Sequence, residues 1–280
     1  MVSALRIALF VEGATTPPPV RGVRPLTQIW NEHLCGALGI RAFHLIEPIS
    51  KKHLVAMDPT QPKMSGASES LDELIARKLK TIKFDAVVVA WDLVPAWNPA
   101  DKFCRWQETL DLYRFLANSP SVDLPDIWKQ RASDRFNELQ SRTTAASRNR
   151  LPQLKPGVVL ALCMEPMFET ALVQDEQALR GVLGLKQLPK DWPIAAWSGA
   201  SNEPCPDTKI LVPTINAVRN VRPRLKCVKQ VPGDFRTNKD GWGEYLLKRL
   251  LANPKAQLQI LSTNMIKRLS EIVPKQPSSR

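Results

Sequence analysis

The stretch FDAVVVAWD, residues 84–92, decides the fold. It is a nearly continuous run of small and β-branched apolar residues, and it ends in a carboxylate, Asp92. Strands that helices cover on both faces have this composition, whereas a strand with one solvated face alternates apolar and polar residues. The stretch therefore predicts a central strand of a parallel sheet.

Three other segments have a similar apolar character and predict further strands, at residues 5–13, 40–48 and 157–165. Helical periodicity appears between the strands at 26–39 and 68–82, and the second of these segments begins with Ser and Glu in capping positions. Alternation of strands and helices along a chain leads to right-handed crossovers and a parallel sheet. We therefore expect an α/β fold, a mainly parallel sheet with helices on both faces.

After the third predicted strand, a longer helical segment interrupts the alternation. Residues 101–119 and 124–142 have the periodicity of two amphipathic helices, and a Ser-, Thr- and Arg-rich link follows them. We interpret 98–155 as a helical, Arg-rich insertion into the α/β domain. Beyond the fourth strand, a further helix is expected over 165–185, where Pro166 suits a first helical turn.

The rest of the chain is less regular. Residues 186–243 are rich in Pro, Trp and Gly, and no helix or strand is predicted for most of them. Two closing helices are expected in the sequences EYLLKRLLA and LQILSTNMIKRLSEIV. We therefore predict one α/β domain over 1–260, followed by a C-terminal helix and tail over 261–280.

The composition is that of a soluble protein. Of its 280 residues, 44% are hydrophobic and 24% are charged, and no apolar run approaches the roughly 18 residues that a membrane span needs. The five Cys residues are scattered without a CxxC pair, which favours reduced thiols and argues against a zinc site. These features predict a cytoplasmic protein without a membrane partner.

The net charge of +12 is the clearest compositional signal. Excess Lys and Arg attract polyanions such as nucleic acid, although they also suit docking onto an acidic protein. The bases concentrate in two segments, 129–150 and 219–229, and the second contains no acid. The arginines of the first segment could equally contact a protein partner. Candidate nucleic-acid contacts in these segments are Arg142, Arg148, Arg150, Arg222 and Arg224.

An acid closes each predicted strand: Glu12, Glu47, Asp92 and Glu165. Ligands gather at the carboxyl ends of parallel strands, and strands lie about 4.8 Å apart, so we expect several of these carboxylates to converge. Carboxylates at such short distances repel one another unless a cation neutralises them. A set of oxygen ligands without His or Cys favours Mg²⁺ or Mn²⁺ as that cation. In a basic protein such a site indicates phosphodiester hydrolysis. The other interpretation is that these acids cap helices or lie in solvated turns, and Glu47 fits it best.

The Glu-Gly step at Glu12 and Gly13, together with the Asp that closes the third strand, resembles a TOPRIM domain, the fold shared by topoisomerases, primases and overcoming-lysogenization-defect nucleases. The resemblance implies that Glu12 takes part in general acid/base or metal chemistry. It also implies that Asp92 belongs to an Asp-x-Asp pair that binds Mg²⁺. The second Asp of that pair would fall at Val94, so this half of the pair is missing.

The sequence FETALVQDEQAL, residues 168–179, is similar to the Glu-x-Trp-Leu-Leu-Ala-Asp-Pro-Glu-Ala-Leu stretch of a TOPRIM-like bacterial family of unknown function. Genes of that family often lie beside ATPase genes in mobile or anti-phage defence loci. On this match Glu169 and Asp175 take the places of the family's Glu and Asp, while Ala171 replaces its Trp. Asp175 would lie on a different helix face from Glu169, so it fits a structural role as well as metal binding. The later NEPCPDTKILVP places Lys209 on the family's lysine.

The resemblance and the acids together predict a Mg²⁺-dependent nuclease subunit of a bacterial defence system, acting on DNA or RNA with an ATPase as partner. Glu12 would be the general base or a metal ligand, and Asp92 with Glu165 or Glu169 would hold the metal. Lys209 or a nearby Arg would stabilise phosphate charge. The alternative is a non-catalytic, degenerate TOPRIM scaffold that binds a protein partner or nucleic acid within a larger complex.

Overall fold

The chain forms two compact units in its computed structural model, which describes residues 6–12, 35, 43–50, 52–53, 56, 69–92, 106–118, 123–144, 147, 156–164, 167–200, 203, 205–221 and 224–256. The first unit contains the described residues up to Met164, and the second contains those from Met167 to Ala256. The sequence predicted one domain over 1–260, whereas the structure divides within that range, directly after the fourth strand. Each unit is therefore described by itself.

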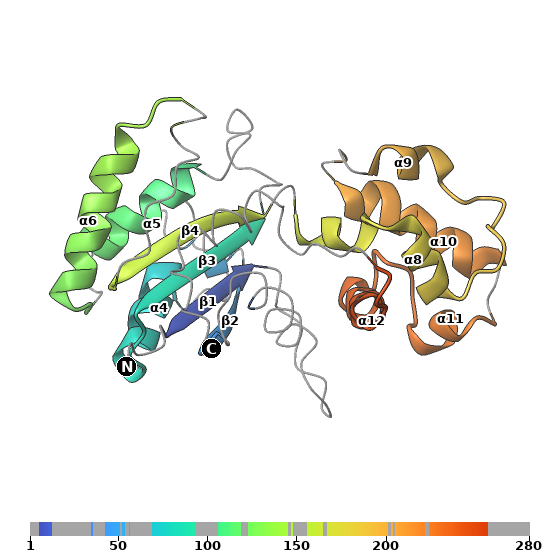
Figure 1. Cartoon of the computed structure of the whole chain (residues 1–280), viewed down its shortest axis with the longest axis horizontal. Helices are drawn as coiled ribbons and strands as arrows, with labels where there is room; N and C mark the ends of the chain where they lie inside the picture. The colour runs from blue at the N-terminus through green and yellow to red at the C-terminus, as the bar shows by residue number, and fades with distance from the viewer. Residues whose placement is uncertain are drawn as a thin grey trace, which may run out of the picture. The chain divides into compact units, whose positions relative to one another are not determined.

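The first unit is built on a four-stranded parallel sheet with the strand order β2-β1-β3-β4 (Figure 1). The strands are β1 (Ile7–Glu12), β2 (Leu45–Ile49), β3 (Ala86–Asp92) and β4 (Val158–Met164). All four predicted strands are present, and the α/β fold with a parallel sheet is confirmed. β2 differs from its prediction, because it begins and ends later than the segment 40–48.

Three helices pack together on one face of this sheet: α4 (Leu71–Thr81), α5 (Trp106–Asn118) and α6 (Asp126–Gln140). Their apolar side chains form a single core with alternate residues of the strands, among them Phe10, Val89 and Trp91. The helices α5 and α6, interpreted from the sequence as an insertion, thus contribute to the main core of the unit. The predicted start of α4 is present as well, because the Ser70 N–H donates a hydrogen bond to the Glu73 carboxylate.

The opposite face of the sheet is buried as well. Leu9 and Val88 alternate with the residues that meet α4, α5 and α6, and both are buried. Burial on both faces explains why β1 and β3 are continuous apolar runs. The helix predicted at 26–39 lies outside the described residues except for Cys35, so helices on this second face stay a prediction. The C-terminal helix and tail predicted at 261–280 also lie outside the described residues.

The second unit contains helices and no strand among its described residues. Its elements are the 3₁₀-helix η2 (Phe168–Val173), α8 (Glu176–Leu183), α9 (Ile194–Ser198), the π-helix η4 (Asp207–Leu211), α10 (Val212–Val221), α11 (Lys226–Gln230) and α12 (Lys239–Leu251). The region 186–243, for which the sequence predicted no clear element, thus holds α9, η4, α10 and α11. Three of these helices, α9, η4 and α11, have only five residues, which is too short for a periodic pattern. None of the helices formed by the described residues has the length and apolar character to cross a membrane.

The prediction of one continuous helix over 165–185 is wrong, because the chain breaks between η2 and α8. Asp175 causes the break. Its Oδ1 accepts the N–H of Ala178 over 2.8 Å, which makes it the N-cap of α8. At the other end of α8, Gly184 adopts a left-handed conformation with φ of 74°. A cap inside an otherwise helical pattern therefore produced two helices in place of one.

Candidate functional site

Two predicted site residues, Glu12 and Asp92, end the two central strands of the sheet. β2 lies on one side of β1 and β3 lies on the other, so the direction of winding reverses between β1 and β3. Open α/β sheets bind ligands at such a topological switch point, outside the carboxyl ends of the strands. Both acids therefore lie where this class of fold binds its ligands.

A hydrogen bond joins the two strand ends. The N–H of Asp92 donates to Oε2 of Glu12 over 3.1 Å. The register explains this contact: Val11 pairs with Ala90, so Glu12 lies level with Trp91 and reaches the amide of the next residue. The side chains of Glu12 and Asp92 are both half-buried. The structure thus brings these two predicted residues together at one edge of the sheet.

Two carboxylates are the candidate metal donors at this edge. Glu12 and Asp92 offer carboxylate oxygens from adjacent strands, and the part of the chain that the structure describes holds no metal-binding group of three or more His, Cys, Asp or Glu side chains. Mg²⁺ is commonly held by one or two carboxylates, with waters and substrate phosphates as its other ligands. Two carboxylates therefore suit Mg²⁺ or Mn²⁺ at a phosphate substrate. Glu165, the further predicted ligand, lies outside the described residues.

Glu47 does not belong to this edge, and the expectation that an acid closes every strand is wrong for β2. Glu47 pairs with Phe10, two residues before Glu12, and β2 continues to Ile49. The Glu47 carboxylate forms an ion pair with Lys78 of α4, with 2.8 Å between Nζ and Oε2. Its role is therefore to join β2 to α4.

Glu169 lies on η2 in the second unit, within a separate charged cluster. Nζ of Lys239 lies 2.7 Å from Oε1 of Glu169 and 3.3 Å from Oδ2 of Asp207. Burial lowers the pKa of Lys239, but the two carboxylates together raise it by more, and the net shift is upward. The lysine therefore stays protonated, and the Glu169 side chain, which is 12% exposed, has an ammonium group as its partner.

The other residues of the family-like motifs have different settings. Asp175 caps α8, which is the structural role that the sequence left open. Lys209 lies exposed on η4, two residues beyond Asp207. Sequence reasoning missed both Asp207 and Lys239. Asp207 stands in the same PDTK motif as Lys209 and could have been noticed, whereas no local pattern marks Lys239.

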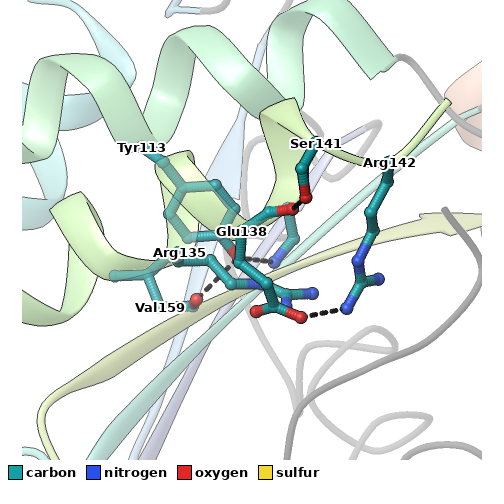
Figure 2. A network of polar contacts seen from close by, with 7 residues as sticks. Tyr113, Arg135, Glu138, Ser141, Arg142 and Val159 are labelled. Atoms are coloured by element: carbon teal, nitrogen blue, oxygen red, sulfur yellow. Dashed lines mark hydrogen bonds and ion pairs between the residues drawn. The ribbon is translucent and has the colours of Figure 1, made fainter. Parts of the chain in front are cut away.

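Arg142, a predicted nucleic-acid contact, has an internal role in the structure (Figure 2). Its guanidinium and that of Arg135 both form ion pairs with the Glu138 carboxylate, and the two arginine side chains are only 10% and 6% exposed. Burial raises the pKa of Glu138, but the hydrogen bonds and charges of the two arginines together lower it by more. Arg142 is thus engaged at the end of α6 and is not presented to solvent. Of the other predicted arginines, Arg224 is exposed, while the structure does not describe Arg148, Arg150 and Arg222.

Tyr113 of α5 extends the polar contacts of this region to the sheet (Figure 2). Its hydroxyl donates to the carbonyl oxygen of Val159 over 2.8 Å and accepts the N–H of Ala161 over 3.2 Å. Both residues belong to β4, which is an edge strand, and edge strands need partners for their backbone groups. Burial raises the pKa of Tyr113, so the hydroxyl keeps its proton. No sequence pattern indicated this contact.

Comparisons of the chain with protein-family models, curated proteins and solved structures found no match. The resemblance to TOPRIM proteins therefore stays a prediction from the sequence motifs. The fold class and the adjacency of Glu12 and Asp92 are observations of the structure itself.

Proposed function

We propose that the chain is a Mg²⁺- or Mn²⁺-dependent nuclease with a TOPRIM-like first unit, acting on DNA or RNA in the bacterial cytoplasm. In this proposal it is a subunit of a defence system and has an ATPase as partner. The observation that carries the proposal is the adjacency of Glu12 and Asp92 at the switch point of the sheet. The net charge of +12 supports it, because a basic protein associates readily with phosphate backbones.

The two carboxylates have distinct roles in this reaction. Asp92 would hold the metal, and Glu12 would serve as general base or as a second ligand. When bound, the metal would activate a water molecule and offset charge on the leaving oxygen. The Asp92 N–H on Oε2 fixes the orientation of the Glu12 carboxylate, which would hold the proton taken from that water.

Two further residues complete the proposal. Glu165 is kept as the third metal ligand in preference to Glu169, whose carboxylate pairs with Lys239. Lys209, exposed on η4, stays the candidate for stabilising phosphate charge, together with a nearby arginine.

A second candidate function is a non-catalytic scaffold that binds a protein partner or nucleic acid. The hydrogen bond from the Asp92 amide favours it, because this bond joins the ends of β1 and β3 and is a structural contact without any metal. Val94 also stands where the resemblance would place a second Asp. In this case the acids hold the edge of the sheet, and binding takes place elsewhere on the chain.

Cleavage of plasmid DNA, single-stranded DNA and total RNA with Mg²⁺ or Mn²⁺ tests the proposal, with and without any ATPase encoded beside the gene. Glu12→Gln and Asp92→Asn remove charge with little change of shape. We expect each to lower the cleavage rate by about 10²-fold or more. Asp85→Asn is the matched control, because Asp85 precedes β3 at the amino edge of the sheet and its carboxylate also accepts a backbone N–H, from Arg6, over 2.6 Å. The control should cut at the wild-type rate.

The outcomes separate the two candidate functions. Loss of cutting in both site variants but not in the control would support the nuclease. Cutting that survives both substitutions, or a wild type that cuts nothing in any condition, would exclude it. If nothing is cut while both variants still bind nucleic acid or a partner like the wild type, the scaffold is favoured.

A further inference from the structure

Five basic residues, all Lys or Arg, lie on or next to the short helix α11 in the second unit. They are Arg219 of α10, Arg224 in the turn before α11, Lys226 and Lys229 of α11, and Arg249 of α12. Two hydrogen bonds bring the neighbouring helices to the end of α11. Nη1 of Arg219 donates to the carbonyl oxygen of Val231 over 3.4 Å, and Nη2 of Arg249 donates to Oε1 of Gln230 over 3.1 Å. We call these five residues the α11 basic face.

The positive charges of this face have no ion-pair partner within the part of the chain that the structure describes. The three bases of α11 and of the turn before it are exposed, and the two arginines from the neighbouring helices are half-buried. Residues 219–230 contain no acid. None of the five bases forms an ion pair with a described residue, in contrast to Arg135, Arg142 and Lys239. The face therefore attracts anions.

Arg249 is held in place without a ligand. Its guanidinium carbon lies 3.5 Å from the centroid of the Tyr245 ring, and Nη1 donates to the carbonyl oxygen of Tyr245 over 3.2 Å. The bond to Gln230 is a third restraint on the same side chain. An arginine that is already ordered loses less conformational entropy when it binds a phosphate.

The face lacks the features of other kinds of binding surface. The aromatic residues of α10, α11 and α12 are Trp242 and Tyr245, and both are buried, so these helices offer no exposed ring for stacking on unpaired bases. A protein interface depends on an apolar centre. The large apolar side chains that are exposed among the described residues all lie outside these helices: Ile82, Ile127, Leu188 and Ile194. Charge is thus the main property that the face offers.

We propose that the α11 basic face binds the phosphate backbone of nucleic acid without base preference. Lys and Arg side chains that contact phosphates position a nucleic acid but do not select its sequence. Selection needs groups that read the edges of the nucleobases or stack on them, and this face has none placed to do so. The inference rests on the proposed function only in taking nucleic acid as the polyanion, since none of the carboxylates of the first unit belongs to the face. It assigns substrate binding to the second unit and the carboxylates to the first.

The test is the affinity of the full chain for a fluorescent DNA duplex of about 30 base pairs, in EDTA, over a salt range of about 50 to 200 mM. The double variant Lys226→Gln, Lys229→Gln removes two exposed charges of the face. We expect the slope of log affinity against log salt concentration to become shallower by about 2, and the affinity to fall about tenfold.

The matched control is the double variant Arg6→Gln, Lys83→Gln. It removes the same charge from two exposed positions of the first unit. Its affinity should stay within about twofold of the wild type, since charges away from the contact act only through the net charge. Thermal melts establish that both double variants fold like the wild type.

Three results would overturn the inference. The first is an equal loss of DNA affinity in both double variants, and the second is an unchanged DNA affinity in the Lys226→Gln, Lys229→Gln double variant. The third is a wild type that does not bind the duplex but binds an acidic polypeptide. EDTA prevents metal-dependent cutting, so this result is independent of catalysis. A specific loss of binding upholds the inference even if cutting is never observed. Conversely, if Glu12→Gln abolishes cutting while the Lys226 and Lys229 variant binds normally, the nuclease proposal stands and this inference fails.

Discussion

The arginines at α6 and the basic residues of the α11 basic face carry the same positive charge but differ in burial and in ion pairing. Arg135 and Arg142 are almost fully buried, and both form ion pairs with Glu138 (Figure 2). On the α11 basic face, three bases are exposed and no base forms an ion pair with a described residue. A local excess of positive charge in a sequence therefore does not by itself indicate a binding surface.

The spacing of acids explains the difference. Glu138 stands three residues after Arg135 and four before Arg142, and both spacings bring side chains together on a helix. Residues 219–230 have no acid that could do the same. A buried charge needs its partner, whereas an exposed base can exchange water for a phosphate. Changes at α6 should therefore alter stability, and changes at the α11 basic face should alter binding.

The largest effect on stability is expected from Glu138→Gln. It removes the carboxylate that pairs with the nearly buried Arg135 and Arg142. Because the Glu138 side chain is itself 48% exposed, solvent screens the pair, and the expected cost is about 2.5 kcal/mol, below that of a fully buried pair. Urea denaturation should show a fall of that size in the free energy of unfolding. Asp134→Asn is the control, since Asp134 is an exposed acid of the same helix whose carboxylate accepts from Gln130 over 2.7 Å. An equal fall in both variants would contradict a special role for the network.

Acid should weaken the same network. The pKa of Glu138 lies below its ordinary value of 4.5, so the unfolded chain takes up this proton more readily than the folded chain. The stability that Glu138 contributes is therefore complete above pH 4.5 and is lost as the pH falls through the lower folded-state pKa. In an acid titration followed by circular dichroism, the wild type should lose more stability below that pH than Glu138→Gln. Parallel titration curves would show that Glu138 is not linked to folding.

Tyr113→Phe should have an intermediate effect. It removes the hydroxyl that bonds the Val159 carbonyl and the Ala161 N–H, and leaving such groups without a partner costs about 2 kcal/mol. Tyr245→Phe is the control, because the Tyr245 hydroxyl makes no hydrogen bond with a described residue. Thermal melts of the two variants provide the measurement. A larger loss for Tyr245→Phe would mean that the Tyr113 hydroxyl does not stabilise the edge strand.

Lys239→Met tests the ion-paired lysine of the second unit. It should lower the free energy of unfolding by about 1 kcal/mol, because it leaves the Glu169 and Asp207 carboxylates without their shared ammonium group. The raised pKa of Lys239 means that its contribution is complete below pH 10.5 and is lost as the pH rises through the higher folded-state pKa. Lys209→Met, at an exposed base of η4, is the control for urea denaturation. Equal stability of the two variants would show that the cluster contributes nothing.

The smallest effect on stability is expected from the double variant Lys226→Gln, Lys229→Gln. Exposed bases without ion pairs contribute little to folding, so the free energy of unfolding should stay within about 0.5 kcal/mol of the wild type. The same urea series measures it. A loss of unfolding free energy as large as that of Glu138→Gln would show that the α11 basic face stabilises the fold. The two groups of basic residues would then not differ in their role.

Local features of the sequence predicted much of the first unit. Apolar runs predicted the four strands, and helical periodicity predicted α4, α5 and α6, because burial on a face imposes a repeating pattern. Glu12 and Asp92 could be assigned to strand ends for the same reason. Glu47 could not, because its position depends on how β2 pairs with β1. A shift in register moves an acid from a strand end into the middle of a strand.

The second unit was harder to predict. The N-cap at Asp175 divides a segment whose periodicity predicts one helix. The helices α9 and α11 have only five residues each, so they are too short to show a helical periodicity. The pairing of Glu169 with Lys239 joins residues far apart along the chain. Such a pair leaves no local pattern.

The sequence by itself determined the class of the fold, the parallel strands and the acids at the ends of β1 and β3. These properties follow from the order of apolar and polar residues along single segments, which records the faces that are buried. Only the tertiary structure decided which charged side chains have partners. It paired Arg142 with Glu138, Glu47 with Lys78 and Glu169 with Lys239, and it left the α11 basic face without an ion pair among the described residues. The physical reason is that an ion pair depends on the distance between two side chains in space, and folding sets that distance.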